Sequence, residues 1–329
     1  MNFNLFHRKK DSSILYIEAL EALLLDDSDG AFEKLRELIR EDTENIRAYL
    51  KLGDIFRLRS QANQAIKIHR SLTFRRHLSV AMKIDIYKSL SLDYYEVGRF
   101  DRAEDSANRI LKFDRKNRWA LEFLIDISEK MKRWEIATKY LKRLDKVIQR
   151  SDFRKHSYYF LMQGLERDDD GLFKEAKGFY NKAIKQDSSY ANPYLHLGNL
   201  EQKSGNLESA VANWIIFAKK STTDAGKEIY DYIEKALFEL GRFGEVEDFY
   251  SSLIDKNEKN IQAIAGLVNV LAAKGDFSGA ESILNDNISK EKESISLRLT
   301  KLKLELRNKK EDALCSQIDE IVLLMEGIQ

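Results

Sequence analysis

The five histidines are the side chains best suited to acid–base or metal chemistry, because imidazole titrates near neutral pH and is a common zinc ligand. No pair of them has the helical spacing of a motif such as H-E-x-x-H, which puts two imidazoles on one helix face. They are spread along the chain at His7, His69, His77, His156 and His196. We expect these histidines to have structural or surface roles, and we expect no metal site.

Two acidic clusters could in principle bind a cation. If Gly30 of "DDSDG" held the sixth place of an EF-hand loop, Leu25 would stand first and Arg36 twelfth. Those places require an acidic residue and a bidentate Glu, so the calcium interpretation fails and a solvated turn is expected. The sequence "RDDDG" at residues 167–171 is likewise expected to be a turn between two helices.

No other catalytic arrangement is present. The sequence has neither a glycine-rich phosphate loop nor a nucleophile elbow. Its single cysteine, Cys315, excludes an internal disulfide and is expected to be a small core residue of a terminal helix. The sequence therefore predicts a protein that is not an enzyme and has no cofactor. It also favours a reducing compartment, the cytoplasm.

Charge and hydropathy exclude further classes. Lys and Arg number 55 against 54 Asp and Glu, so no large field of one sign draws the chain to nucleic acid. No run approaches the roughly 18 apolar residues of a membrane-spanning helix. The chain is therefore expected neither to enter nor to cross a membrane unaided. With one Pro and 15 Gly in 329 residues, the chain rarely breaks its helices, which predicts an all-α fold.

A repeated pattern positions the remaining polar side chains. Residues 190–217 follow the tetratricopeptide pattern of two helices around a turn, with Tyr194, Leu197, Gly198, Gly205, Ala210, Trp214 and Phe217 at its characteristic places. Its small second-helix residue recurs every 33 to 39 residues, close to the 34-residue period of this repeat. The series runs Ala31, Ala65, Ala103, Ala137, Ala176, Ala210, Val246, Ala280 and Ala313.

The residue types have physical reasons. Gly53 and Gly198 are expected to let the two helices of a repeat approach closely. Turn glycines are expected in the left-handed conformation at Gly98, Gly205, Gly241 and Gly275. Asn192 is expected to be a helix N-cap, followed by Pro193 at the first helical position. The longer steps predict longer connections near residues 73–82 and 151–157.

A single such hairpin cannot bury its apolar face, so stacking must create the core. We predict a tetratricopeptide-repeat solenoid, a right-handed superhelix of about nine helical hairpins with a concave groove. Residues 1–11 are expected to form a basic flexible tail, residues 12–290 the repeat array and residues 291–329 the closing helices.

The concave groove is the expected binding surface. Asp54, Asp85, Glu122 and Asp126 would interrupt a basic clamp for an acidic chaperone tail, so a protein or peptide partner is favoured. Aromatic and Arg side chains suit such a partner, although the same residues could be ordinary solvated side chains. The candidate partner-binding residues are Arg47, Leu50, Asp54, Arg57, Lys88, Tyr95, Trp119, Glu122, Asp126, Asn199 and Lys203.

Residues 14–112 resemble the lipopolysaccharide-assembly protein B family of Gram-negative bacteria. The resemblance lies in one repeat at Leu52, Gly53, Phe56, Arg57, Arg59, Ala65, Ile66, Ile68 and His69, and in the next at Phe100 and residues 101–105. It implies an inner-membrane adaptor that works with a membrane-bound protease to regulate breakdown of the lipid A deacetylase. The family also carries a spanning helix and a zinc domain with two C-x-x-C pairs, and this sequence contains neither. The resemblance therefore implies a membrane contact that is indirect, peripheral at the inner membrane, or made through a segment preceding residue 1.

Two functional hypotheses follow. The first is a non-catalytic adaptor that presents a partner to an envelope-biogenesis or proteolytic complex. The second is a generic tetratricopeptide assembly scaffold, or co-chaperone, with unrelated partners.

Overall fold

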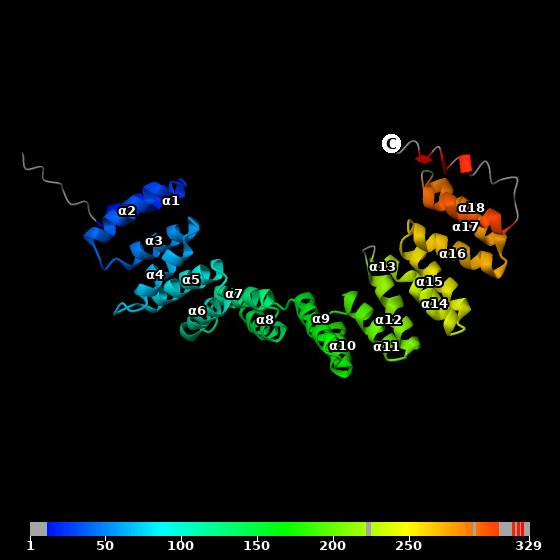
Figure 1. Cartoon of the computed structure of the whole chain (residues 1–329), viewed down its shortest axis with the longest axis horizontal. Helices are drawn as coiled ribbons and strands as arrows, with labels where there is room; N and C mark the ends of the chain where they lie inside the picture. The colour runs from blue at the N-terminus through cyan, green and yellow to red at the C-terminus, as the bar shows by residue number, and fades with distance from the viewer. Residues whose placement is uncertain are drawn as a thin grey trace, which may run out of the picture. The chain divides into compact units, whose positions relative to one another are not determined.

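The structure is a computed structural model that describes residues 12–221, 225–291 and 294–308, and also 318, 319, 321, 322, 324 and 325. In these residues the regular elements are α-helices and no strand occurs (Figure 1). The predicted all-α repeat solenoid is confirmed as the fold class. Contacts divide the chain into two compact units, unit 1 ending at Asp152 and unit 2 beginning at Phe153.

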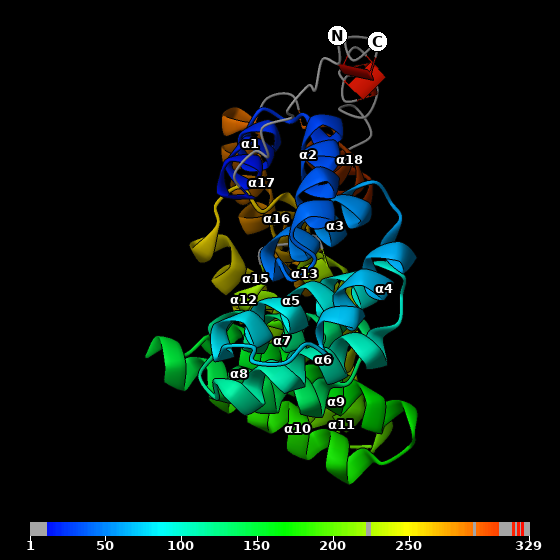
Figure 2. The ribbon, with the colours of Figure 1, turned by 90° about the vertical axis from the view of Figure 1, so that its left-hand side faces the viewer.

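Unit 1 is a succession of helical hairpins in which each helix packs on the next along the chain (Figures 1 and 2). The first helices of its hairpins are α1 (Ser12–Leu24), α3 (Ile46–Leu58), α5 (Val80–Glu96) and α7 (Arg118–Lys130). The second helices are α2 (Ser28–Glu41), α4 (Ala62–Leu72), α6 (Phe100–Phe113) and α8 (Trp134–Ile148).

Unit 2 continues the pattern. Its helices are α9 (Phe153–Asp169), α10 (Phe173–Gln186), α11 (Asn192–Lys203), α12 (Leu207–Lys220), α13 (Ala225–Glu228), α14 (Tyr230–Glu239), α15 (Phe243–Lys256), α16 (Ile261–Lys274), α17 (Phe277–Lys290) and α18 (Ile295–Arg307). The short α13 and α14 together take the place of one first helix. The expected tail at residues 1–11, with His7, and the closing positions Ala313 and Cys315 lie outside the described residues.

The second-helix anchors are confirmed as the packing points of the repeats. From Ala31 to Ala280, every described member of the series is completely buried, including Val246. Their small side chains leave room for the neighbouring helix, which is why the position repeats along the sequence.

The close approach predicted at glycine is also confirmed. A Cβ at Gly53 would lie 2.2 Å from Nε2 of His69, and one at Gly198 would lie 2.5 Å from the ring of Trp214. The turn glycines are left-handed, with φ of +71° at Gly98 and +84° at Gly275. Two corresponding turns use other residues, because Ser60 and Lys132 also have positive φ.

Two local predictions were wrong. Asn192 is the first residue of α11 rather than its N-cap, which is Ala191, so Pro193 stands one place inside the helix. The connection between α8 and α9 spans only residues 149–152, because α9 begins at Phe153 and absorbs the extra length in its 17 residues. By contrast, the longer connection after α4 is present at residues 73–79.

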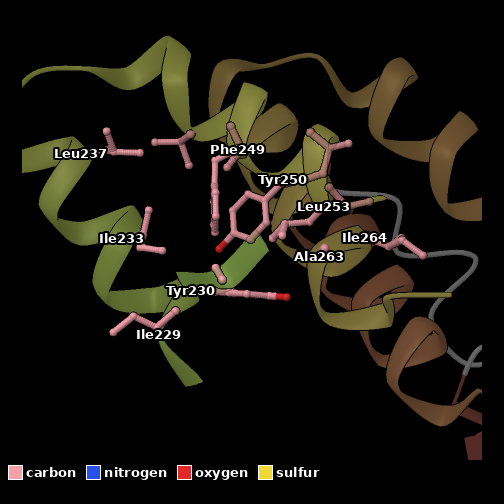
Figure 3. Close-up of a cluster of buried hydrophobic side chains, with 14 of the residues drawn as sticks. Ile229, Tyr230, Ile233, Leu237, Phe249, Tyr250, Leu253, Ala263 and Ile264 are labelled. Atoms are coloured by element: carbon pink, nitrogen blue, oxygen red, sulfur yellow. The ribbon is translucent and has the colours of Figure 1, made fainter. Parts of the chain in front are cut away.

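The apolar seams between helices form the core of each unit. In unit 2, Tyr230 of α14 meets Phe249 and Tyr250 of α15 in an aromatic cluster closed by aliphatic side chains such as Ile233 and Leu253 (Figure 3). The rings of Tyr230 and Phe249 pack edge to face at 5.5 Å. Burial of these apolar side chains is the main stabilising contribution in such repeats. Each hairpin buries them only against its neighbours.

Candidate functional site

Unit 1 contains a cavity of about 440 Å³ lined by the first helices of three successive hairpins. We name it the first-helix cavity. It brings together five of the predicted groove residues, Arg47, Leu50, Asp54, Arg57 and Lys88. The other residues lining it are Tyr16, Lys51, Asp85, Ser89 and Leu92.

Arg57 sits at the base of this cavity and is held by two carboxylates. Its guanidinium donates to Asp54 at 2.8 Å and to the fully buried Asp93 at 2.7 Å. Burial opposes the charged form, but the hydrogen bonds and charges of Asp93 and Asp54 outweigh it and raise the pKa of Arg57. Arg57 therefore links α3 to α5, and two carboxylates of the protein already pair with its guanidinium.

His69 completes the same network from α4. Its Nδ1 lies 2.6 Å from Asp93 Oδ2, and its Nε2 lies 3.0 Å from the carbonyl oxygen of Leu50. A carbonyl oxygen can only accept, so Nε2 donates to Leu50, and Nδ1 forms the hydrogen bond with Asp93. The predicted structural role of His69 is confirmed, since its side chain is fully buried and joins three helices.

The charged side chains free to meet a partner stand at the rim of the cavity. Arg47, Asp85 and Lys88 are exposed. Among the described residues, none of the three forms an ion pair. Lys88 instead lies 5.1 Å above the ring of Trp119. The rim thus offers two cations and one carboxylate beside the apolar surface of Leu92.

An aromatic patch adjoins the cavity through Lys88. We define it as Tyr95, Phe100, Trp119 and Phe123. The rings of Trp119 and Phe123 stack at 4.8 Å, and Tyr95 packs against Phe123 at 5.4 Å. These half-buried rings form a continuous surface across α5, α6 and α7, of the kind enriched at binding hot spots.

Two predicted acidic residues border the aromatic patch. Asp126 accepts a hydrogen bond from the hydroxyl of Tyr95, and Glu122 pairs with Arg118 at 2.7 Å. Burial, followed by the bond to Asp126, raises the pKa of Tyr95. Asp126 is therefore engaged in fixing the tyrosine, whereas Glu122 is exposed.

The last two predicted residues belong to unit 2. Asn199 accepts a hydrogen bond from Trp214 Nε1 at 2.8 Å, and Lys203 pairs with Asp168 at 2.9 Å. Their side chains hold α11 against α12 and α9. They are not part of the first-helix cavity, whose lining lies wholly in unit 1.

Sequence reasoning missed Asp93, the most buried charge of the site. It lies directly between Leu92 and Tyr94 in the sequence, and that local context was the available signal. A carboxylate in such a place requires a cationic partner.

The part of the chain that the structure describes contains no group of three or more His, Cys, Asp or Glu side chains placed to hold a metal ion. Its helices also lack the combination of length and apolar character that crossing a bilayer needs.

Comparison with known proteins extends the family resemblance. No protein-family model matches the sequence. Lipopolysaccharide assembly protein B of Escherichia coli is 22% identical over 266 residues, which cover 81% of this chain and 68% of the relative. The protein of the same name in Haemophilus influenzae is 25% identical over 206 residues, covering 60% of this chain and 51% of the relative. This chain is similar to lipopolysaccharide assembly protein B over most of its length.

The similarity to lipopolysaccharide assembly protein B reaches well beyond residues 14–112, where the motifs had placed it.

Solved structures also resemble the chain. A tetratricopeptide repeat protein from Parabacteroides merdae has a TM-score of 0.40 at 16% identity, covering 79% of this chain and 98% of its own. MamA from Desulfovibrio magneticus has a TM-score of 0.33 at 14% identity, covering 54% and 95%.

The residues that carry the resemblance to lipopolysaccharide assembly protein B mainly hold the hairpins together. Arg57 and His69 meet at Asp93, and Phe56 packs edge to face on Phe32 at 5.4 Å. Asp101, with its neighbour Glu104, pairs with Arg133 of the following hairpin at 3.0 and 2.9 Å. The side chains at the cavity rim are therefore better candidates for contacting a partner.

Proposed function

We propose that this chain is a non-catalytic adaptor that binds a segment of a partner protein in the first-helix cavity of unit 1. The observation that carries the proposal is the pair of exposed cations, Arg47 and Lys88, at the rim of a cavity whose deeper Arg57 is already neutralised. Similarity to lipopolysaccharide assembly protein B supports a repeat-based scaffold rather than a catalyst.

The cavity suggests the chemistry of the bound segment. An acidic side chain of the partner would pair with Arg47 and Lys88, while Asp85 would accept from a basic side chain or a backbone N–H. The apolar floor at Leu50 and Leu92, continued by Trp119, would take an apolar side chain next to it. The favoured segment therefore combines an acidic residue with a large apolar one.

The biological setting that we propose is the one implied by the resemblance to lipopolysaccharide assembly protein B. The adaptor would act in lipopolysaccharide assembly at the cytoplasmic face of the inner membrane. Its partners would be a membrane-bound protease complex and the substrate of that protease, the deacetylase of lipid A synthesis. The support is the match to lipopolysaccharide assembly protein B over 81% of this chain.

Site-specific photo-crosslinking in the source organism tests the proposal. A photoreactive residue replaces Asp85 in the cavity, and a control chain carries it at Lys116, an exposed position on the α6–α7 connection. The proposal expects an envelope-biogenesis or protease component to crosslink from position 85 and not from 116. Crosslinks from position 85 only to proteins unrelated to the envelope would favour the generic scaffold, and identical crosslinks from both positions would contradict the use of the cavity.

A further inference from the structure

A second pocket lies on another face of unit 1, between the second helices α4 and α6 with α5 as its floor. Its volume is about 410 Å³, and we name it the second-helix pocket. It shares no lining residue with the first-helix cavity. Its lining residues are Arg70, Thr73, Tyr87, Leu90, Tyr94, Arg102, Asp105, Ser106, Asn108, Arg109 and Lys112.

The pocket is strongly basic in a chain of almost balanced charge. Four cationic side chains, Arg70, Arg102, Arg109 and Lys112, face one carboxylate, Asp105, whereas the whole chain has a net charge of +1. The carboxylate reaches only Arg102, at 4.0 Å, the outer limit of an ion pair. In the described part of the chain, no acidic side chain pairs with the other three cations.

Such a concentration of cations is not a general property of this surface. The pocket of similar size in unit 2 is lined by Asp255, Glu258 and Asp286, with Lys290 as its only basic side chain. Like charges placed together repel one another, and an anion that binds between them relieves the repulsion.

We propose that the second-helix pocket binds a phosphate group. A guanidinium presents a planar fork that binds two phosphate oxygens at once, and three arginine side chains line this pocket. A phosphate monoester carries a charge of about −2 near neutral pH and so matches several cations, whereas a single carboxylate would neutralise only one.

The rest of the pocket accommodates what the phosphate is attached to. The half-buried rings of Tyr87 and Tyr94 and the buried Leu90 give the floor an apolar character beside the cations. The ligand class is therefore a phosphate ester with an uncharged remainder, either a small soluble ester or the headgroup of a phospholipid. This inference does not depend on the proposed adaptor function, because the two sites have separate linings.

Binding measurements with two probes distinguish these sources. Glycerol 3-phosphate is titrated into the full chain by calorimetry at fixed ionic strength. Flotation then measures binding to phosphatidylcholine vesicles with and without phosphatidic acid. Binding of the soluble probe points to a free phosphate ester, and binding only of the phosphatidic acid vesicles points to a lipid headgroup. Either result supports a phosphate site, and absence of both at millimolar concentration overturns it.

Substitutions of the pocket arginines test whether the phosphate probe binds in the second-helix pocket. The Arg70→Gln, Arg109→Gln double variant should weaken binding of the active probe by about tenfold or more, since it removes two of the cations and both of their guanidinium forks. Arg70→Lys, Arg109→Lys keeps the charge without the forks and should retain more affinity than the Gln variant. The control Lys67→Gln, Lys116→Gln removes the same charge from exposed positions outside the pocket and should stay within about twofold.

Two results would overturn the assignment. One is undiminished binding in the Arg70→Gln, Arg109→Gln variant, with an unchanged melting temperature showing that it folds. The other is a dicarboxylate probe, succinate, that binds as tightly as glycerol 3-phosphate.

Discussion

His69 and Asp93 form a buried hydrogen bond of 2.6 Å between successive hairpins, and Arg57 pairs with the same carboxylate at 2.7 Å. Both partners of the His69–Asp93 bond have side chains that are completely buried. Asp93 is thus the common anchor of α3, α4 and α5 beneath the first-helix cavity. Arg57 and Asp93 are paired within the protein, whereas the charged side chains at the rim are available to bind a partner.

Replacing Asp93 should be among the most damaging single changes in unit 1. Asp93→Asn leaves Arg57 and His69 without their shared counter-charge, and breaking a buried pair in this way costs about 3–5 kcal/mol. Urea unfolding, followed through hydrogen exchange of the α3–α5 amides, measures the loss locally. Asp85→Asn, on the exposed side of the same helix, is the control and should change stability by less than about 0.5 kcal/mol. Equal effects of the two substitutions would contradict the anchoring role.

Arg57→Glu should reduce stability rather than selectively reduce binding. The new carboxylate would lie beside Asp54 and the buried Asp93, where like charges repel and nothing replaces the guanidinium. We expect a loss of about 3 kcal/mol or more, read as a lower urea midpoint. A variant that unfolds at the wild-type midpoint would show that Arg57 is not structural. Arg57 would then again be a candidate for binding a partner.

Replacing either of two helical glycines by alanine should change the folding stability, in opposite directions at the two positions. At Gly53 a Cβ would overlap the ring of His69, so Gly53→Ala should destabilise by about 1–3 kcal/mol. At Gly178 in α10 the same Cβ would meet nothing within 4 Å, so Gly178→Ala should stabilise by about 1 kcal/mol through helix propensity alone. Thermal unfolding of the two variants against the wild type measures both signs. A Gly53→Ala protein at least as stable as the wild type would argue against the close approach.

The stability of unit 2 should depend on pH through His196. Burial lowers the pKa of His196 below its ordinary 6.5, an effect opposed by Asp168 and reinforced by Lys203. The unfolded chain therefore binds a proton more readily than the folded one, so this group's contribution is present above about pH 6.5 and is lost as the pH falls. Urea unfolding between about pH 7.5 and 5.5 should show a steeper loss in wild type than in His196→Gln. Parallel curves would show that His196 does not titrate differently on folding.

The repeat architecture could be predicted from the sequence because its determinants are local and periodic. A small residue such as Ala65 or Ala210 recurs at a nearly fixed interval, and the structure buries each of these anchors. The glycine opposite a large second-helix side chain, Gly198 against Trp214, follows from the same spacing.

What the sequence did not reveal depends on contacts between hairpins. Asp93 and Arg57 are 36 residues apart, and no local pattern shows that they meet. The second-helix pocket likewise requires Arg70 of one hairpin and Arg109 of the next to face a common space. The assignment of Arg57 to the open groove was incomplete for this reason, since periodicity places a side chain on a face but does not show its partners.

The most direct measurement is the dissociation constant of the partner segment identified by crosslinking, for wild type and for Arg47→Glu, Lys88→Glu. The control Arg115→Glu, Lys116→Glu makes the same charge change on the exposed connection between α6 and α7. The account predicts that the cavity variant weakens binding by about tenfold or more at an unchanged melting temperature, with the control near the wild type. Equal affinities of all three proteins would contradict a partner site in the first-helix cavity.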